Sequence, residues 1–309
     1  MSVELVKEKC AWAINTVEIG RPGGSAVKIG GETCMPFLYH EGTMPNKPLI
    51  AMEILDCEPT DWPDAIKNTY GDVVRDPSAW AEKCVKGFGA NILCVRLASV
   101  HPDYGARSTD RVVSVLKSIV GRVNVPLVIL GSGDDERDND VMPKVSQALK
   151  GENCLIGIAT QNNHKTLAAT CLADGHSIIA ESPIDINIAK QVNILISDMG
   201  FDPARIVMHP TTTSLGYGME YVYSIMERAR LAAFIGDKML AMPFVLFVGQ
   251  EVWKTKEAKE SSAIQGVNWE ISTGVAMLQA GADLLVIRHP DAARSLVKYI
   301  DEMMKGAKS

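Results

Sequence analysis

Several features that mark other protein classes are missing from this 309-residue chain. No segment approaches the roughly 20 apolar residues of a membrane-spanning helix, and the N-terminus lacks the apolar core of a secretory signal. We therefore expect a cytoplasmic protein that does not enter a membrane. Lysine and arginine (31) are outnumbered by aspartate and glutamate (37) and form no basic stripe, so nucleic acid is not expected as a partner.

Motifs for metal binding and covalent catalysis are also missing. The seven cysteines are widely spaced and include no Cys-x-x-Cys, which predicts reduced, mostly buried thiols. No His-x-His or His-Glu-x-x-His occurs, and His209 and His289 lie on separate predicted strands, so we predict no metal site. None of the apolar runs contains an interior lysine, which disfavours a Schiff-base aldolase.

A regular alternation of apolar runs and amphipathic stretches begins at residue 50. The runs rich in valine, isoleucine and leucine cover 50–54, 91–97, 125–130, 154–160, 177–182, 205–209, 243–248 and 283–289. The helical patterns cover 77–87, 109–121, 138–149, 163–173, 185–199, 219–236, 268–280 and 290–304. Near-continuous apolar runs are typical of buried parallel strands, so the pattern predicts an α/β fold, a closed (β/α)₈ TIM barrel. A doubly wound open sheet is the alternative.

The first part of the chain does not fit this repeat. Residues 26–32 read as a strand with a glycine turn, a possible β-hairpin that plugs the bottom of the barrel. We divide the chain into an N-terminal extension, 1–49, that packs on the barrel, and the barrel itself, 50–309. Residues 55–76 are expected to form a long connection on the functional side. Trp62 and Trp253 stand in loop-like stretches. For both, the default prediction is a core residue and the alternative is an interface anchor.

The most distinctive stretch follows the sixth predicted strand and reads His-Pro-Thr-Thr-Thr-Ser-Leu-Gly-Tyr-Gly-Met-Glu-Tyr over residues 209–221. It offers hydroxyls, glycine amides and an aromatic face but no nucleophile or base, so we predict that it holds or covers something polar. The other strand ends carry polar groups without a recognisable catalytic set, and we predict no catalytic residue. These groups are Glu53, Asp56, Arg96, Asp134, Asp135, Thr160, Asn162, Glu181, Asp185, Gly249, Glu251, Arg288 and His289.

Six long and chemically unusual motifs resemble one known family. They are Asp61-Trp62-Pro63-Asp64 and the stretches 76–85, 182–191, 215–221, 224–228 and 236–240. Because they are spread over essentially the whole chain, chance agreement in all of them is improbable. The chain resembles the small (delta) subunit of the corrinoid iron–sulfur protein of the acetyl-CoA synthase/carbon monoxide dehydrogenase system, the Wood–Ljungdahl system of carbon fixation.

The resemblance implies a noncatalytic barrel subunit that pairs with a large subunit. In that family the large subunit carries a [4Fe–4S] cluster and a cobalamin domain, and the heterodimer carries a methyl group from methyltetrahydrofolate, through a methyltransferase, to acetyl-CoA synthase. The expected partners of this chain are therefore the large subunit, the methyltetrahydrofolate methyltransferase and acetyl-CoA synthase. The barrel's carboxyl end would cap the cobalamin, a corrinoid shared at the interface.

The residues that match the family's loops are Asp185, Asn187, Thr211, Thr212, Thr213, Gly216, Tyr217, Gly218 and Tyr221. We expect their hydroxyls and backbone amides to meet the amide side chains of the corrin ring, with Tyr217 as a flat apolar contact. Alternatively, Asp185 and Thr213 cap the following helices and the glycines allow the turn.

Two further functions stay open at this stage. A pterin-dependent methyltransferase would use the same barrel end, with Asp134, Asn162, Asp185 and Asn187 as candidate pterin contacts. A barrel lyase for a small phosphorylated substrate would bind phosphate near 249–251 and 288–291.

Overall fold

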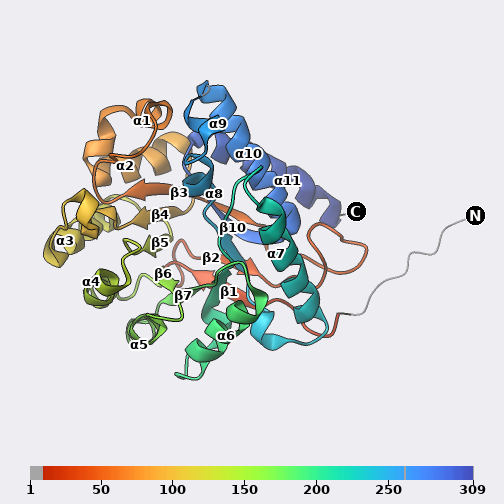
Figure 1. The fold of residues 1–309 in the computed structure, drawn as a ribbon. Helices are drawn as coiled ribbons and strands as arrows, with labels where there is room; N and C mark the ends of the chain where they lie inside the picture. The colour runs from red at the N-terminus through yellow and green to blue at the C-terminus, as the bar shows by residue number, and fades with distance from the viewer. Residues whose placement is uncertain (1–9, 261, 309) are drawn as a thin grey trace, which may run out of the picture.

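A closed barrel of eight parallel strands forms the centre of the molecule, in a computed structural model that describes residues 10–260 and 262–308 (Figure 1). The strands follow one another around the barrel in chain order, and the last pairs with the first. They are β3 (Leu49–Leu55), β4 (Leu93–Arg96), β5 (Leu127–Leu130), β6 (Leu155–Ala159), β7 (Ser177–Glu181), β8 (Ile206–His209), β9 (Phe244–Leu246) and β10 (Ala282–Ile287). The predicted TIM barrel is confirmed, and each strand lies within or overlaps its apolar run.

Helices surround the strands on the outside (Figure 1). They are α1 (Asp64–Tyr70), α2 (Pro77–Glu82), α3 (Thr109–Arg122), α4 (Asp135–Ala148), α5 (His164–Asp174), α6 (Ile186–Ser197), α7 (Met219–Phe234), α8 (Val248–Val252), α9 (Lys256–Lys259), α10 (Ala263–Ala280) and α11 (Pro290–Met303). A π-helical turn, Lys83–Gly87, continues α2, and 3₁₀ turns include Gly71–Arg75 after α1.

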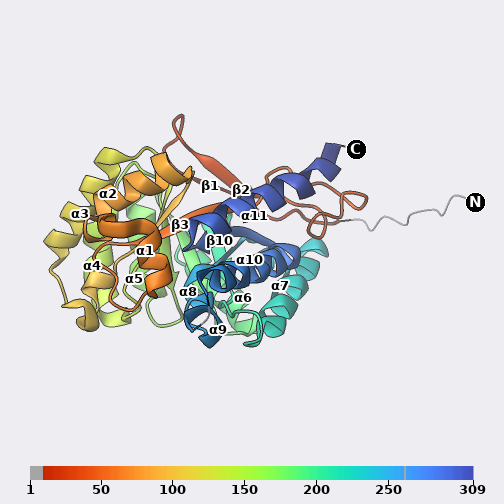
Figure 2. The ribbon, with the colours of Figure 1, turned by 90° about the horizontal axis from the view of Figure 1, so that it is seen from above.

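The predicted hairpin is present and closes the barrel at the end where the strands begin. Strands β1 (Thr16–Ile19) and β2 (Val27–Gly30) pair antiparallel. Val17, Ile19 and Ile29 are buried in the same cluster as side chains from the barrel interior. Only glycine fits at Gly30, because φ is +83° and an added Cβ would lie 2.1 Å from the Asn15 carbonyl oxygen. Figure 2 shows the hairpin at one end of the barrel and α9 toward the other.

An ion cluster in the core joins the N-terminal segment to the barrel. Arg230 of α7 donates from Nη1 to Glu32 Oε2 at 3.0 Å and from Nη2 to Asp283 Oδ2 at 2.5 Å. All three side chains are at most 4% exposed. Because each charge lies out of water, the cluster is a strong constraint on how the segment around Glu32 packs.

Two connections contain helices that the sequence pattern did not predict. Residues 55–76 include α1, which buries Ile66 and Tyr70, and the connection after β9 includes α8 and α9. These helices have four to seven residues, too few to show a 3.6-residue period. Trp62 and Trp253 are 3% and 1% exposed, so they are core residues and not surface anchors.

Six cysteines are buried, Cys10 is half-buried, and all seven are free, as the prediction of mostly buried thiols requires. Among the described residues, no helix has both the length and the apolar character needed to cross a membrane.

Candidate functional site at the carboxyl end of the barrel

The threonine–glycine loop, residues 210–218, connects β8 to α7 at the end where the barrel strands finish. Thr211 has a left-handed backbone (φ +63°), and its hydroxyl donates to the Ser182 carbonyl at 2.7 Å, which ties the loop to the connection after β7. The Leu215 amide donates to Thr273 Oγ1 of α10 at 3.2 Å. Neighbouring elements therefore hold the loop on two sides.

Thr212 points into the protein and joins a buried hydrogen-bond chain. The Phe247 amide donates to Thr212 Oγ1 at 2.9 Å, and Thr212 Oγ1 lies 3.0 Å from His209 Nε2. On its other side, His209 Nδ1 lies 2.7 Å from Glu181 Oε2. The Thr212 hydroxyl, which accepts the Phe247 amide, therefore lies between the backbone at the end of β9 and the His209 ring. The chain links β7, β8 and the end of β9, so Thr212 has a positioning role.

The outer part of the loop is accessible. Tyr217 and Tyr221 are 49% and 63% exposed, and Gly216 is exposed beside them. Gly216 and Gly218 have φ of +80° and +90°, so the turn needs residues without a side chain. Tyr217 Oη donates to Glu257 Oε2 of α9 at 2.8 Å, a third attachment of the loop. The result is a fixed aromatic surface at the rim of the barrel.

Asp185 and Asn187 lie on the neighbouring connection, after β7. The Asp185 carboxylate accepts the backbone amides of Asn187 at 2.7 Å and Ile188 at 3.2 Å, so it caps the N-terminus of α6, as the alternative interpretation expected. The Asn187 side chain is exposed. Thr213 does not cap α7, because that helix begins at Met219 after Gly218. Its buried hydroxyl has no hydrogen-bond partner among the described residues.

Three ionised side chains meet at the centre of the barrel's carboxyl end. Glu53 of β3 is fully buried and accepts Arg96 Nε at 2.8 Å and Arg288 Nε at 2.6 Å. Burial alone would raise the pKa of Glu53, but the guanidinium groups of Arg288 and Arg96 outweigh it and lower the pKa to about 2. The sequence predicted all three residues at strand ends but did not show that they meet. We call Glu53, Arg96 and Arg288 the Glu53 cluster.

Two polar residues at this end were not among those that the sequence analysis identified. Gln250 of α8 accepts a hydrogen bond from Arg96 Nη2. Glu270 of α10 is fully buried and accepts the backbone amides of Arg288 at 2.7 Å and His289 at 3.2 Å and the indole N–H of Trp253 at 2.9 Å. Burial raises the pKa of Glu270 to about 7, although these three donors act in the opposite direction.

Replacing Glu270 with methionine is expected to remove a contribution to the free energy of unfolding that depends on pH. The carboxyl titrates near pH 7 when folded and near pH 4.3 when unfolded. Its contribution is therefore fully present below about pH 4.3 and is lost as the pH rises through 7. Within this window, the difference in unfolding free energy between wild type and variant should fall by up to about 1.4 kcal/mol per pH unit. Urea denaturation across the window measures it, and a constant difference would contradict the assignment.

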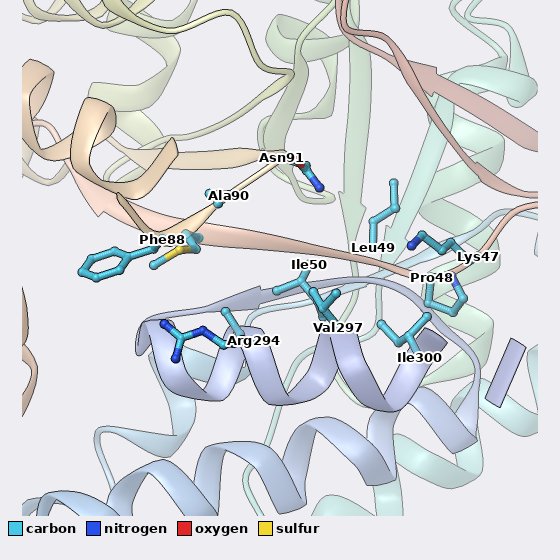
Figure 3. Close-up of a pocket in the computed structure, with 13 residues that line it drawn as sticks. Lys47, Pro48, Leu49, Ile50, Phe88, Ala90, Asn91, Arg294, Val297 and Ile300 are labelled. Carbon is cyan, nitrogen blue, oxygen red and sulfur yellow. The ribbon is translucent and has the colours of Figure 1, made fainter. Parts of the chain in front are cut away.

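A hollow between β3 and α11 lies at the other end of the barrel. It measures about 260 Å³ and is bordered by residues at the start of β3, residues before β4, and α11 (Figure 3). Ile50, Val297 and Ile300 give it a mostly apolar wall. Among the described residues, no group of three or more histidine, cysteine, aspartate or glutamate side chains is placed to hold a metal ion.

Comparison with known proteins identifies the family. A family model described as the CO dehydrogenase/acetyl-CoA synthase delta subunit matches residues 16–300. The acetyl-CoA decarbonylase/synthase complex subunit delta of Methanocaldococcus jannaschii is 32% identical over 94% of this chain and 74% of its own. The Methanothermobacter thermautotrophicus subunit is 33% identical over 91% of this chain and 73% of its own.

Solved structures of dihydropteroate synthases share the barrel fold. The Thermus thermophilus enzyme covers 87% of this chain and 99% of its own at 14% identity, with a TM-score of 0.57. The Yersinia pestis enzyme covers 85% and 96% at 13% identity, also with a TM-score of 0.57. At this identity the likeness concerns the fold alone. The family model and the relatives together show that the chain belongs to the delta subunits of CO dehydrogenase/acetyl-CoA synthase complexes.

Proposed function

We propose that this chain is the noncatalytic small subunit of a heterodimeric corrinoid iron–sulfur methyl carrier. Its barrel mouth caps the cobalamin held by the large subunit, which also carries the [4Fe–4S] cluster, while a methyl group passes from the methyltetrahydrofolate:corrinoid methyltransferase to acetyl-CoA synthase. The observation that carries the proposal is the threonine–glycine loop, which is attached to three neighbouring elements and presents Tyr217 at the rim, together with the exposed Tyr221 in the first turn of α7.

The residues at the rim suit a corrinoid. The ring's edge carries amide side chains, which need hydrogen-bond donors and acceptors, and its face is apolar. The exposed Asn187 side chain and the backbone amides around Gly216 supply the polar groups. The bound cobalamin would supply the cobalt that carries the methyl group. The role of this chain is to orient that group and to exclude water from it.

Co-purification tests this assignment. Tagged chain isolated without oxygen from its native host should bring with it a larger subunit that contains cobalt and iron. The same preparation should show the visible absorption of a corrinoid. Isolation of the chain with neither metal, from cells that make the complex, would contradict the proposal.

Replacing both Tyr217 and Tyr221 with alanine is expected to weaken binding to the large subunit by roughly 30-fold, about 2 kcal/mol, because exposed aromatic anchors dominate such interfaces. Calorimetric titration of one subunit with the other measures the change. Ile235→Ala is the matched control, since Ile235 is 83% exposed just past the opposite end of α7. Tyr217→Phe should keep most of the affinity because it keeps the ring. Equal losses for Ile235→Ala and the double variant would place the interface elsewhere.

A pterin-dependent methyltransferase is the competing function at the same barrel end. Two of its candidate pterin contacts already have backbone partners, since the Asp134 carboxylate accepts the Arg137 amide at 3.1 Å and Asp185 caps α6. Titration of the isolated chain with methyltetrahydrofolate separates the two functions. Tight binding without a partner subunit would favour the enzyme over the cap.

A further inference from the structure

We infer that Arg96 and Arg288, at the centre of the barrel's carboxyl end, form a binding site for a carboxylate or phosphate group of a small molecule. This inference rests on the chain's own side chains and is independent of the proposed role in corrinoid capping. Two guanidinium groups share the single carboxylate of Glu53, and each uses only its Nε for that contact.

The charges of the cluster do not balance. Arg96 Nη2 donates to Gln250, whose amide is neutral, and no other Nη atom of either arginine has a hydrogen-bond acceptor among residues 10–260 and 262–308. Glu251 acts on Arg96 through its charge without a hydrogen bond, and it is itself paired with Lys254 at 2.8 Å. Glu53, Arg96 and Arg288 counted by themselves therefore keep one positive charge, although the side chains of Arg96 and Arg288 are only 13% and 7% exposed. A largely buried charge without a directly paired counter-charge is costly, and a bound anion would reduce that cost.

Glu270 does not supply the missing counter-charge by direct contact. Its two carboxylate oxygens accept the backbone amides of Arg288 and His289 and the indole of Trp253, and no hydrogen bond from either guanidinium group reaches it in the part of the chain that is described. The Nη donors therefore stay available.

An aromatic ring packs against one face of each guanidinium group. The Arg288 guanidinium lies over the Trp62 ring at 4.5 Å, and that of Arg96 lies over the Phe247 ring at 5.8 Å. Glu53 holds both Nε atoms from the buried side. Gly249 lets α8 approach, since an added Cβ would lie 2.6 Å from the Arg288 backbone nitrogen. The remaining N–H groups are therefore held in place before a ligand arrives, and their in-plane geometry suits an oxyanion.

Substitutions at Gln250 test the site without removing a member of the ion cluster. Gln250→Glu places a carboxylate beside Arg96 and should supply the missing charge from within the chain. Gln250→Met removes the contact with Arg96 and leaves the charge uncompensated. Wild type should bind phosphate or acetate saturably, as measured by calorimetry and by thermal stabilisation relative to chloride at equal ionic strength. We expect binding to weaken about tenfold or more in Gln250→Glu and to persist in Gln250→Met.

Comparison of the two anions distinguishes a phosphate ligand from a carboxylate ligand. Binding of phosphate alone assigns a phosphate ligand, and binding of acetate alone assigns a carboxylate ligand. Both support the site, provided that Gln250→Glu weakens the binding and has a melting temperature no lower than wild type. Absence of saturable binding of either anion to wild type overturns the inference, and so does equal affinity in wild type and Gln250→Glu.

Discussion

Replacing Arg230 with methionine is expected to lower the free energy of unfolding by about 3–5 kcal/mol. The change leaves the carboxyl groups of Glu32 and Asp283 buried without their cation, and both side chains are at most 4% exposed. Burial already raises the pKa of Asp283 well above its usual range, although Arg230 opposes this rise. Without the arginine nothing opposes the effect of burial on Asp283, so the pKa of Asp283 should rise further and the cost of burying this carboxyl at neutral pH should increase.

Urea denaturation at neutral pH measures the loss. The control is Arg122→Met, which removes a surface pair with Glu82 and should cost less than about 1 kcal/mol. Because Glu32 lies in the N-terminal segment, backbone amides of β1 and β2 should also exchange with deuterium faster in the Arg230 variant. A loss no larger than that of the control would show that the buried cluster does not hold the segment in place.

Replacing Glu53 with glutamine is expected to cost a similar amount, about 3–5 kcal/mol, because two buried guanidinium groups then face a neutral amide. The difference in unfolding free energy between wild type and variant should decrease as the pH falls. The pKa of Glu53 is about 2 in the folded chain and near 4.3 when unfolded, so its stabilisation is present above about pH 4.3 and is lost as the pH falls toward 2.

The comparison of wild type with Glu53→Gln therefore needs two pH values. The difference in unfolding free energy should be large at neutral pH and smaller by about 3 kcal/mol near pH 2. Glu82→Gln, at an exposed ion pair, controls for the general effect of acid. A difference that does not change with pH would mean that the Glu53 carboxylate is not the charged partner of the two arginines.

The barrel could be predicted from the sequence because its signals are local. Each strand is a short apolar run bounded by turns, and most helices are long enough to show their period. Helices α1, α8 and α9 could not be predicted because they are too short for a period to appear. For the hairpin, the strand predicted within residues 26–32 is present as β2, but the turn of the hairpin lies before this strand, at residues 20–26, and not at the glycines that end it.

The Glu53 cluster could not be predicted because it depends on closure of the barrel. Glu53 and Arg288 are 235 positions apart, and only the pairing of β10 with β3 brings them together. Glu270 did leave a signal. It shares the inward face of α10 with Gly266, Gly274 and Met277, so an acid stands on a buried helical face.

The position of the candidate site could be predicted from the types of its residues, but the contacts of its side chains could not. The loop after β8 has the place at the barrel end that was expected, and Tyr217 and Tyr221 are exposed there. The sequence could not show that Thr212 turns inward to His209, since this depends on the distant amide of Phe247. Nor could it decide whether Asp185 faces a ligand or caps α6, because both functions use the same residue type at the same position.

Hydrogen exchange in the assembled complex tests the central claim most directly. Amides of residues 211–221 should become protected when the corrinoid-bearing large subunit binds, and amides of residues 231–236, at the far end of α7, should not change. Protection of 231–236 with no change in 211–221 would contradict the proposal that the carboxyl end of this barrel covers the corrinoid.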